Sequence, residues 1–376
     1  MKRTILFSTF SLLILSSCTN FHFNIPDYSF DDVPIIIDMD SVITDTLKFN
    51  RIRYIPLETT DECLIGAASK TMIKNDKIYV CDYSRANALF VFDMTGKFLF
   101  KIARMGQGPG EYIRITDFDI QTNDDIYLYD GGSGRKILVF DSKGTHLMNI
   151  QMNYRCKSFC LIDNKIYWSK PSDYRNFACL VAYDMDNKKT EILLDEKYVY
   201  DSKIDDFHPF DFYHSPDTVI FYAPKFSKII YTIDKEGIHP AIGVKNLKET
   251  PKSTIVAWLQ EDDYLERHKL MTHNKYFVDL AYIFENENYI CFNFNMDRDI
   301  VLYNKHSKST FLIPRSSLLD SFGDRLIKGS TGKDFFGVIA FNPDMNRHKK
   351  ILESREELKN WQEDDNPVVV IFNPDN

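Results

Sequence analysis

An all-β fold built from repeated four-stranded units is predicted by three features of this 376-residue sequence. The first is a repeat: residues 75–102 align without a gap with residues 123–150, and 11 of the 28 aligned pairs are identical. The second is strand-like alternation inside the repeat, as in KIYVCD (77–82). The third is turn chemistry, as in MTGK (94–97). Four-stranded units that recur every 40–60 residues or so are typical of a β-propeller.

The first unit contains four expected strands, and the second repeats them 48 residues later. Gly96 and Gly144 stand in equivalent turns, where glycine is free to take a positive φ. The expected strands of the first unit are residues 67–74, 77–82, 88–93 and 98–102.

Weaker copies of the pattern extend the repeat to six units. The sixth is expected to combine residues near both ends of the chain, which closes the ring and removes exposed strand edges. The weaker copies are 164–169 with 179–194, 217–223 with 228–242, and 287–294 with 299–313; the sixth unit draws on 334–341, 367–372, 33–39 and 51–57.

Two stretches interrupt the strand pattern and are expected to be short helical insertions on one face. Residues 253–270 place Ile255, Trp258, Leu259 and Leu265 near helical spacing. Residues 353–362 precede the last strand.

The N-terminus indicates export and lipid anchoring. Lys2 and Arg3 precede an apolar run over residues 4–15, and Leu-Ser-Ser-Cys follows, with its cysteine at Cys18. This order resembles a bacterial lipobox, which implies cleavage after residue 17 and a lipid on Cys18; the alternative is an ordinary cleaved signal. The expected divisions are a signal peptide (1–17), a lipidated tether (18–32) and the propeller (33–376).

The charge argues against a nucleic-acid partner. Removing residues 1–17 takes away two positive charges and moves the formal net charge from −8 to −10, whereas nucleic-acid binding requires a basic surface. The six cysteines beyond Cys18 show no zinc-ligand spacing, so we expect mostly free buried thiols, with one disulfide left open.

With these features in view, the sequence resembles the six-bladed β-propeller lipoproteins of Bacteroides-type bacteria, which are related in architecture to NHL-repeat propellers. The resemblance rests on the lipobox and on four further segments, and it spans nearly the whole mature chain. It implies the fold and a cell-envelope location, with the outer membrane suggested, and it implies little about chemistry. The four segments are IPLET with LIG (55–66), IYVCD with VFD (78–93), GQGPGEY (106–112) and NPVVVIF (366–372).

The glycine-rich stretch RMGQGPGEY (104–112) is interpreted as a connection between the first two blades. It lacks the Lys-Ser/Thr ending of a P-loop, Pro109 removes a backbone donor, and a strand follows rather than a helix. GGSGR (131–135) ends in Arg135 and lies among strands, so it is expected to be a turn and not a serine nucleophile elbow.

Other clusters are weighed in the same way. HPFDFYH (208–214) holds His208, Asp211 and His214, but residues three apart on a strand point to opposite faces, so blade packing is favoured over a metal site. DMDN (184–187) is expected to be a hairpin turn rather than a calcium loop. No catalytic residue, metal or cofactor is assigned.

Two hypotheses for function remain. The first is a non-catalytic binding module for an envelope protein or glycan; the second is a hydrolase or lyase with a metal or carboxylate site in the central funnel. Because propeller loops are free for recognition, Arg104, Glu111, Tyr112 and Arg135 are predicted to border the binding surface. The alternative is that Arg104 and Glu111 only pin their loop with an ion pair.

Overall fold

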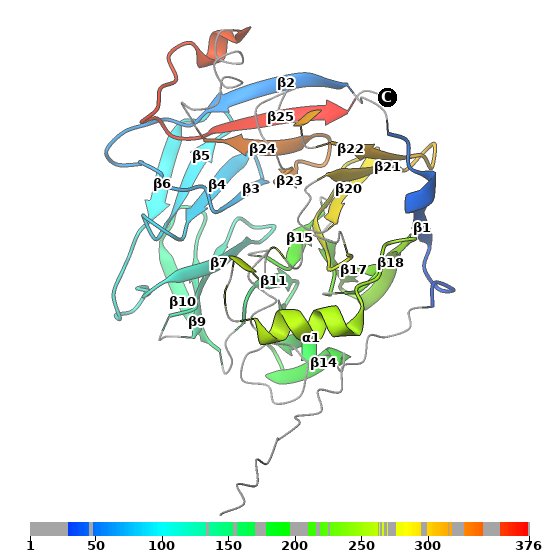
Figure 1. Ribbon diagram of the computed structural model, residues 1–376. Coiled ribbons are helices and arrows are strands. Elements are labelled where there is room, and N and C mark those ends of the chain that lie inside the picture. Colours follow the sequence, from blue (N-terminus) through cyan, green and yellow to red (C-terminus); the bar gives the residue numbers. More distant parts are fainter. Residues whose placement is uncertain are drawn as a thin grey trace, which may run out of the picture.

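The computed structural model is a ring of six antiparallel sheets around a central axis, which confirms the six-bladed β-propeller (Figure 1). In each sheet the strand at one end of the sheet lies at the axis, and several of these inner strands contact one another. The structure describes residues 29–44, 48–132, 135–152, 156–169, 178–195, 210–215, 219–224, 226–261, 263, 265–266, 269, 276–294, 299–314, 316–317, 327–340 and 354–374.

The first three blades follow the order expected from the repeat. Blade 1 holds β3 (Lys70–Lys74), β4 (Lys77–Asp82), β5 (Ala88–Asp93) and β6 (Phe98–Ile102). Blade 2 holds β7 (Ile115–Ile120), β8 (Ile126–Asp130), β9 (Lys136–Phe140) and β10 (His146–Gln151). Blade 3 holds β11 (Phe159–Ile162), β12 (Lys165–Ser169), β13 (Ala178–Asp184) and β14 (Lys189–Asp195).

The last three blades depend on both ends of the chain. Blade 4 holds β15 (Phe212–His214), β16 (Ile220–Tyr222), β17 (Ile229–Asp234), β18 (Gly237–Lys245) and an added β1 (Ile35–Asp38). Blade 5 holds β19 (Leu280–Glu285), β20 (Tyr289–Phe294), β21 (Ile300–Asn304) and β22 (Thr310–Ile313). Blade 6 holds β23 (Gly329–Ser330), β24 (Phe335–Ile339), β25 (Val368–Pro374) and β2 (Phe49–Pro56).

The repeated aspartates hold the turns. Asp82 ends β4 and accepts hydrogen bonds from the backbone N–H groups of Gly66 and Ala67, which tie the preceding interblade loop to blade 1. Its counterpart Asp130 does the same for the next interblade loop. Gly96 and Gly144 take φ values of +87° and +79°, as their turns require.

The N-terminal segment covers the rims of three blades. β1 pairs in parallel with β18 of blade 4, and Ile43 bridges to Phe311 of blade 5 before β2 closes blade 6 against β25. The expectation that residues 33–39 join the sixth unit is therefore wrong, whereas residues 51–57 do so. Ile37 is buried where β1 pairs with β18, so this placement removes apolar surface from water.

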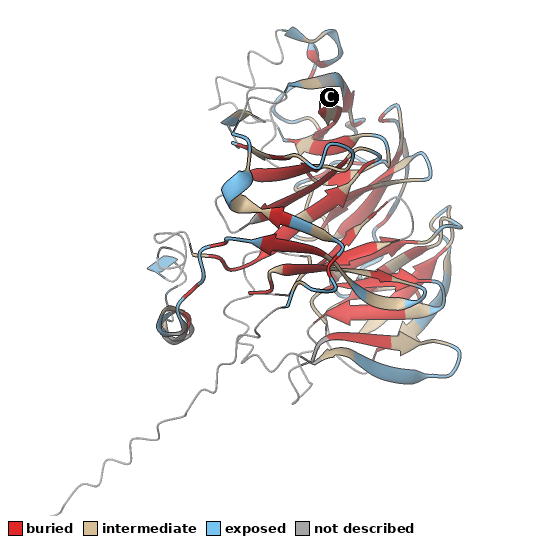
Figure 2. Cartoon of the chain, turned by 90° about the vertical axis from the view of Figure 1, so that its right-hand side faces the viewer, coloured by how far each residue is buried: buried red, intermediate tan, exposed pale blue. Residues whose placement is uncertain are grey.

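Helix α1 (Lys252–Gln260) stands out from one face of the disc (Figure 2). The predicted helical spacing of Ile255 and Trp258 is confirmed, and both side chains are buried; Trp258 stacks on Phe226 with ring centroids 6.5 Å apart. Leu265 lies beyond the end of α1 and is 66% exposed, so it does not extend this apolar face.

Two 3₁₀ turns, η1 (Met39–Ser41) and η3 (Glu356–Leu358), complete the described elements; η3 lies within the predicted 353–362 helix and buries Leu358. Within the part of the chain that the structure covers, no helix is long and apolar enough to span a bilayer.

Candidate functional site

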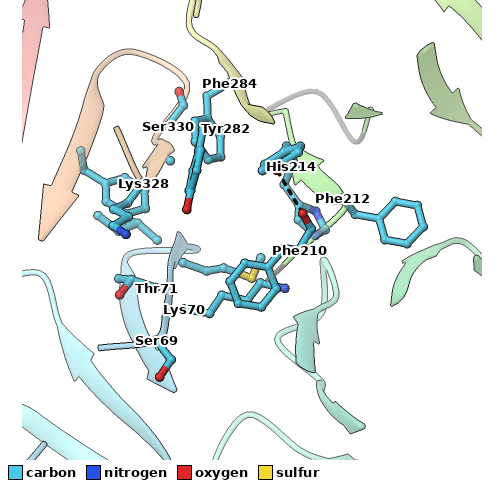
Figure 3. A pocket seen from close by; sticks show the side chains of 15 residues that line it. Ser69, Lys70, Thr71, Phe210, Phe212, His214, Tyr282, Phe284, Lys328 and Ser330 are labelled. Carbon is cyan, nitrogen blue, oxygen red and sulfur yellow. Dashed lines mark hydrogen bonds between the residues drawn. The ribbon is translucent and has the colours of Figure 1, made fainter. Parts of the chain in front are cut away.

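The axis of the propeller holds a small chamber between the inner strands of blades 1, 4, 5 and 6 (Figure 3). Its volume is about 100 Å³. Most of its wall is aromatic and apolar, with two lysines, one histidine and three hydroxyl-bearing aliphatic side chains. The lining residues are Ser69, Lys70, Thr71, Met72, Ile73, Phe210, Phe212, Tyr213, His214, Tyr282, Phe284, Lys328, Gly329, Ser330 and Phe336.

A wider funnel of about 570 Å³ adjoins the chamber. It is bordered by the ends of the inner strands and by the turns that follow them, and its wall is rich in amides and hydroxyls. Met72, Ile73, His214 and Ser330 line both spaces, so the chamber and the funnel share a wall. The other lining residues are Lys74, Asn75, Gln121, Thr122, Asn123, Tyr127, Leu161, Ile162, Asp163, Ser215, Ile220 and Thr331.

A buried ion pair joins blades 1 and 2 beside the chamber. The ammonium nitrogen of Lys70 lies 2.6 Å from Oδ1 of Asp117 and also donates to the carbonyl of Phe118 at 2.8 Å. The same nitrogen lies between the rings of Phe118 and Phe210, 5.0 and 4.9 Å from their centroids. Burial raises the pKa of Asp117, although Lys70 works in the opposite direction.

The axial carboxylates hold backbone groups of an edge strand. Asp117 accepts a hydrogen bond from the N–H of Phe159, and Asp119 accepts one from the N–H of Leu161, both on β11. An inner strand is an edge strand, and its buried N–H groups need such partners. Asp117 and Asp119 are therefore committed to joining blades 2 and 3.

His214 reaches Asp119 from blade 4. Its Nε2 lies 3.2 Å from Oδ1 of Asp119, and its ring borders both the chamber and the funnel. Burial lowers the pKa of His214 to about 4; Asp119 opposes this shift, while Lys74 and Lys70 add to it. The imidazole is therefore neutral at neutral pH.

Tyr282 occupies a strained position in the chamber wall. Its φ is +53°, which is unusual for a bulky residue, and it lies where the pairing of β19 with β20 shifts register. Such bulges redirect a side chain, and in Figure 3 the ring of Tyr282 lies between Lys328 and His214. The ammonium nitrogen of Lys328 is 5.7 Å from the centroid of this ring.

The metal-site hypothesis finds no support among the residues that the structure describes, because no three His, Cys, Asp or Glu side chains converge there. Within HPFDFYH, Asp211 pairs with Lys157 at 3.2 Å and His214 faces Asp119, while His208 lies outside the described residues. Asp184 accepts the backbone N–H groups of residues 186 and 187, so DMDN is the predicted hairpin turn.

The glycine-rich stretch does connect blades 1 and 2, as predicted. Arg104 is exposed, with its guanidinium 5.9 Å from the ring centroid of Phe140. The carboxylate of Glu111 accepts from the N–H of Gly108. The structure, which describes both Arg104 and Glu111, shows no ion pair between them. Tyr112 is fully buried and donates to the carbonyl of Asn87 at 2.8 Å, which makes its role in this structure one of holding the loop.

The remaining predicted positions lie apart from the axial chamber. Arg135 directly precedes β9 and is half-buried, with a φ of +43°, and its carbonyl accepts from the N–H of Met152. Cys18 lies outside the described residues. The cysteines whose side chains are described are free thiols, as expected for most of the six: Cys63, Cys81, Cys156, Cys160 and Cys291.

The sequence reasoning missed the chamber. Its strongest available signal was TDFDI (116–120), in which two aspartates replace Ser69 and Thr71 of the first repeat inside an otherwise apolar inner strand. Lys328 and Tyr282 had no comparable signal, because the repeat is weak in blades 5 and 6.

Fold and site together define a six-bladed propeller with an aromatic chamber and a polar funnel on its axis. The chain belongs to the family called Domain of unknown function (DUF4934), whose model matches residues 35–373. No curated protein matches the sequence.

Solved structures of other proteins share the fold, including two from Bacteroides species. A protein of Bacteroides fragilis NCTC 9343 that is described as exported has a TM-score of 0.68 at 18% identity, over 91% of this chain and 99% of that one. A member of the DUF4221 family from Bacteroides vulgatus ATCC 8482 has a TM-score of 0.51 at 10% identity, over 88% and 98%.

Proposed function

We propose that this protein is a lipid-anchored lipoprotein of the bacterial envelope, held in the outer membrane through Cys18, whose propeller binds a glycan without catalysing a reaction. The anchor is supported by the lipobox, and the location is supported by the similarity to a protein described as exported. Metabolic labelling with a fatty-acid probe should mark the wild type and not Cys18→Ser. Equal labelling of both would contradict the anchor.

The observation that carries the glycan assignment is the lining of the funnel. Amides and hydroxyls both donate and accept hydrogen bonds, so they complement sugar hydroxyls. The half-buried ring of Tyr127 adds an apolar surface, and the volume of about 570 Å³ lies within the usual range of ligand pockets. The funnel's amides and aliphatic hydroxyls are those of Asn75, Gln121, Thr122, Asn123, Ser215, Ser330 and Thr331.

The axial carboxylates favour binding over catalysis. Asp117 accepts from the ammonium of Lys70 and from the N–H of Phe159, and Asp119 accepts from the N–H groups of Ile120 and Leu161. A general acid or base needs freedom to exchange a proton with a substrate, and these groups are engaged in joining blades.

The test is a glycan array followed by calorimetry with the mature protein solubilised in detergent. We expect Tyr127→Ala and Gln121→Ala to weaken the binding of any glycan that the wild type retains by about tenfold, because each removes one contact group. Lys143→Ala, at an exposed rim turn, is the control and should bind like the wild type.

Failure of every glycan to bind would contradict the assignment. Capture of an envelope protein that is lost in Arg104→Ala and Arg135→Ala would instead identify the interblade loops as a protein-binding surface.

A further inference from the structure

The chamber and the funnel lie end to end along the axis. On the inner strand of blade 1, residues 69–73 line the chamber and residues 72–75 line the funnel. On blade 6, residues 328–330 line the chamber and residues 330–331 line the funnel, so the same order recurs on a second inner strand. A ligand that fills the funnel can therefore extend one group into the chamber.

Aromatic rings from three blades form one part of the chamber wall. The side chains of Phe212, Phe284 and Phe336 are at most 7% exposed and come from blades 4, 5 and 6. The ring of Phe284 packs edge-on against that of Tyr213, with centroids 5.5 Å apart. Rings arranged in this way favour a small apolar group such as a methyl, because its burial among them removes apolar surface from water.

A buried hydroxyl belongs to the blade 1 side of the same wall. Thr71 is only 6% exposed, and its Oγ1 has no hydrogen-bond partner among the described residues. Figure 3 places Thr71 on one side of the chamber and Phe212 with His214 on the other. A buried hydroxyl without a partner is rare and requires an explanation, and a ligand carbonyl that accepts from it would supply one.

The size and the charge of the chamber limit what enters it. A volume of about 100 Å³ accepts a small group and not a chain of sugars. Lys70 in this wall is already paired with Asp117 at 2.6 Å and also donates to the carbonyl of Phe118. A neutral group therefore suits the chamber, provided that it offers a methyl to the rings and an acceptor to Thr71.

We propose that the chamber receives the acetamido group of an N-acetylated amino sugar, with its methyl beside the rings of Phe212 and Phe284 and its carbonyl accepting from the hydroxyl of Thr71. The acetamido group combines a methyl with a strong acceptor in a very small volume. A 6-deoxy sugar supplies the methyl without the carbonyl, so it leaves Thr71 unpaired. This inference rests on the proposed function, since the rest of the glycan occupies the funnel.

The experiment compares two matched probes, methyl N-acetyl-β-D-glucosaminide and methyl β-D-glucoside, which differ only in an acetamido group in place of one hydroxyl. Ligand-observed NMR titration with the mature protein gives both affinities. We expect the N-acetylated probe to bind about tenfold more tightly, because methyl burial and one hydrogen bond add up. Its acetyl methyl should also receive the strongest saturation transfer of all its protons, because it lies beside buried rings.

Two variants make the same change at threonines that are both 6% exposed. Thr71→Val removes the hydroxyl in the chamber and should reduce the preference for the N-acetylated probe about threefold or more. Its melting temperature should not fall, because this hydroxyl makes no hydrogen bond to a described residue. Thr310→Val, on the outer strand β22 of blade 5, should keep the full preference.

A longer acyl chain tests whether the site is closed. Methyl N-hexanoyl-β-D-glucosaminide keeps the amide but lengthens its apolar chain. Because the chamber has a volume of only about 100 Å³, this probe should bind more weakly than the N-acetylated one. On an open apolar surface the longer chain would bind more tightly, since it buries more apolar area, and that result would contradict the chamber as the site.

The remaining outcomes separate the inference from the proposed function. Equal affinity for the first two probes, or an unchanged preference in Thr71→Val, contradicts the acetamido site, while binding of both probes still supports the proposed function. Retention of only those arrayed glycans that lack an N-acyl group, or tighter binding of methyl α-L-fucoside than of the N-acetylated probe, also contradicts the acetamido site alone. If neither probe nor any arrayed glycan binds, the proposed function fails and the inference fails with it.

Discussion

The ammonium of Lys70 and the carboxylate of Asp117 lie 2.6 Å apart and join the inner strands of blades 1 and 2 away from water. A second pair between the same blades, Lys77 with Asp124, has the same separation but is about a fifth exposed. The two pairs therefore differ in burial and hardly in distance, which makes them a matched comparison.

Asp117→Ala is expected to lower the free energy of unfolding by about 3–5 kcal/mol, because it leaves the ammonium of Lys70 buried without a counter-ion. Lys77→Ala should cost about 1 kcal/mol or less, as exposed pairs do. Denaturant titration of both variants measures the difference. Similar losses would show that burial of the axial pair is not what makes it important.

His214 is expected to make stability depend on pH. Its folded pKa of about 4 lies below the ordinary histidine value of 6.5. Between these two pH values the unfolded chain therefore binds a proton at this residue and the folded chain does not. The contribution is complete above about pH 6.5 and is lost as the pH falls toward 4. Because 22% of the side chain is exposed, we expect a loss of roughly 2–3 kcal/mol and not more.

Thermal denaturation of the wild type and His214→Gln between pH 4 and 7 checks this prediction. Comparison with the variant subtracts other acidic groups, including Asp117, whose pKa is raised by burial. The difference between the two proteins should shrink as the pH falls. A constant difference over this range would argue against a depressed histidine pKa.

Asn366 is expected to stabilise the closure of the ring through its hydrogen bonds. Its buried amide donates to the carbonyls of Glu58 and Cys63 and accepts from the N–H of Ile65, so it ties the C-terminal segment to the loop that enters blade 1. Asn366→Ala should lower the unfolding free energy by about 3 kcal/mol or more, since three buried groups lose their partner. Asn373→Ala, at a more exposed amide, should cost much less.

Two residues of the loop between blades 1 and 2, the buried Tyr112 and the exposed Arg104, are expected to differ in their effect on stability. Tyr112→Phe should cost about 1–2 kcal/mol, because the carbonyls of Asn87 and Ile102 lose their donor. Arg104→Ala should cost about 1 kcal/mol or less, because it removes one exposed cation–π contact. Melting curves of the two variants should rank in this order, and the reverse ranking would assign the structural role to Arg104.

The number of blades, the turns and most outer strands could be predicted from the sequence alone. These features depend on residues close together in the chain: β-formers alternate every second position, and aspartates such as Asp93 and Asp141 accept backbone N–H groups a few residues on. The glycine-rich loop was also interpreted correctly, since Pro109 and the strand that follows are local facts.

The placement of β1 and the composition of the axis could not be predicted in this way, because they depend on contacts between distant parts of the chain. β1 pairs with β18, which follows it by more than 200 residues, and neither segment carries a sequence pattern that identifies the other as its partner. The chamber likewise joins Thr71 to Lys328, and such contacts depend on how the closed ring brings inner strands together. Their physical origin is the burial of apolar surface between blades, which is non-directional and leaves no short-range pattern in the chain.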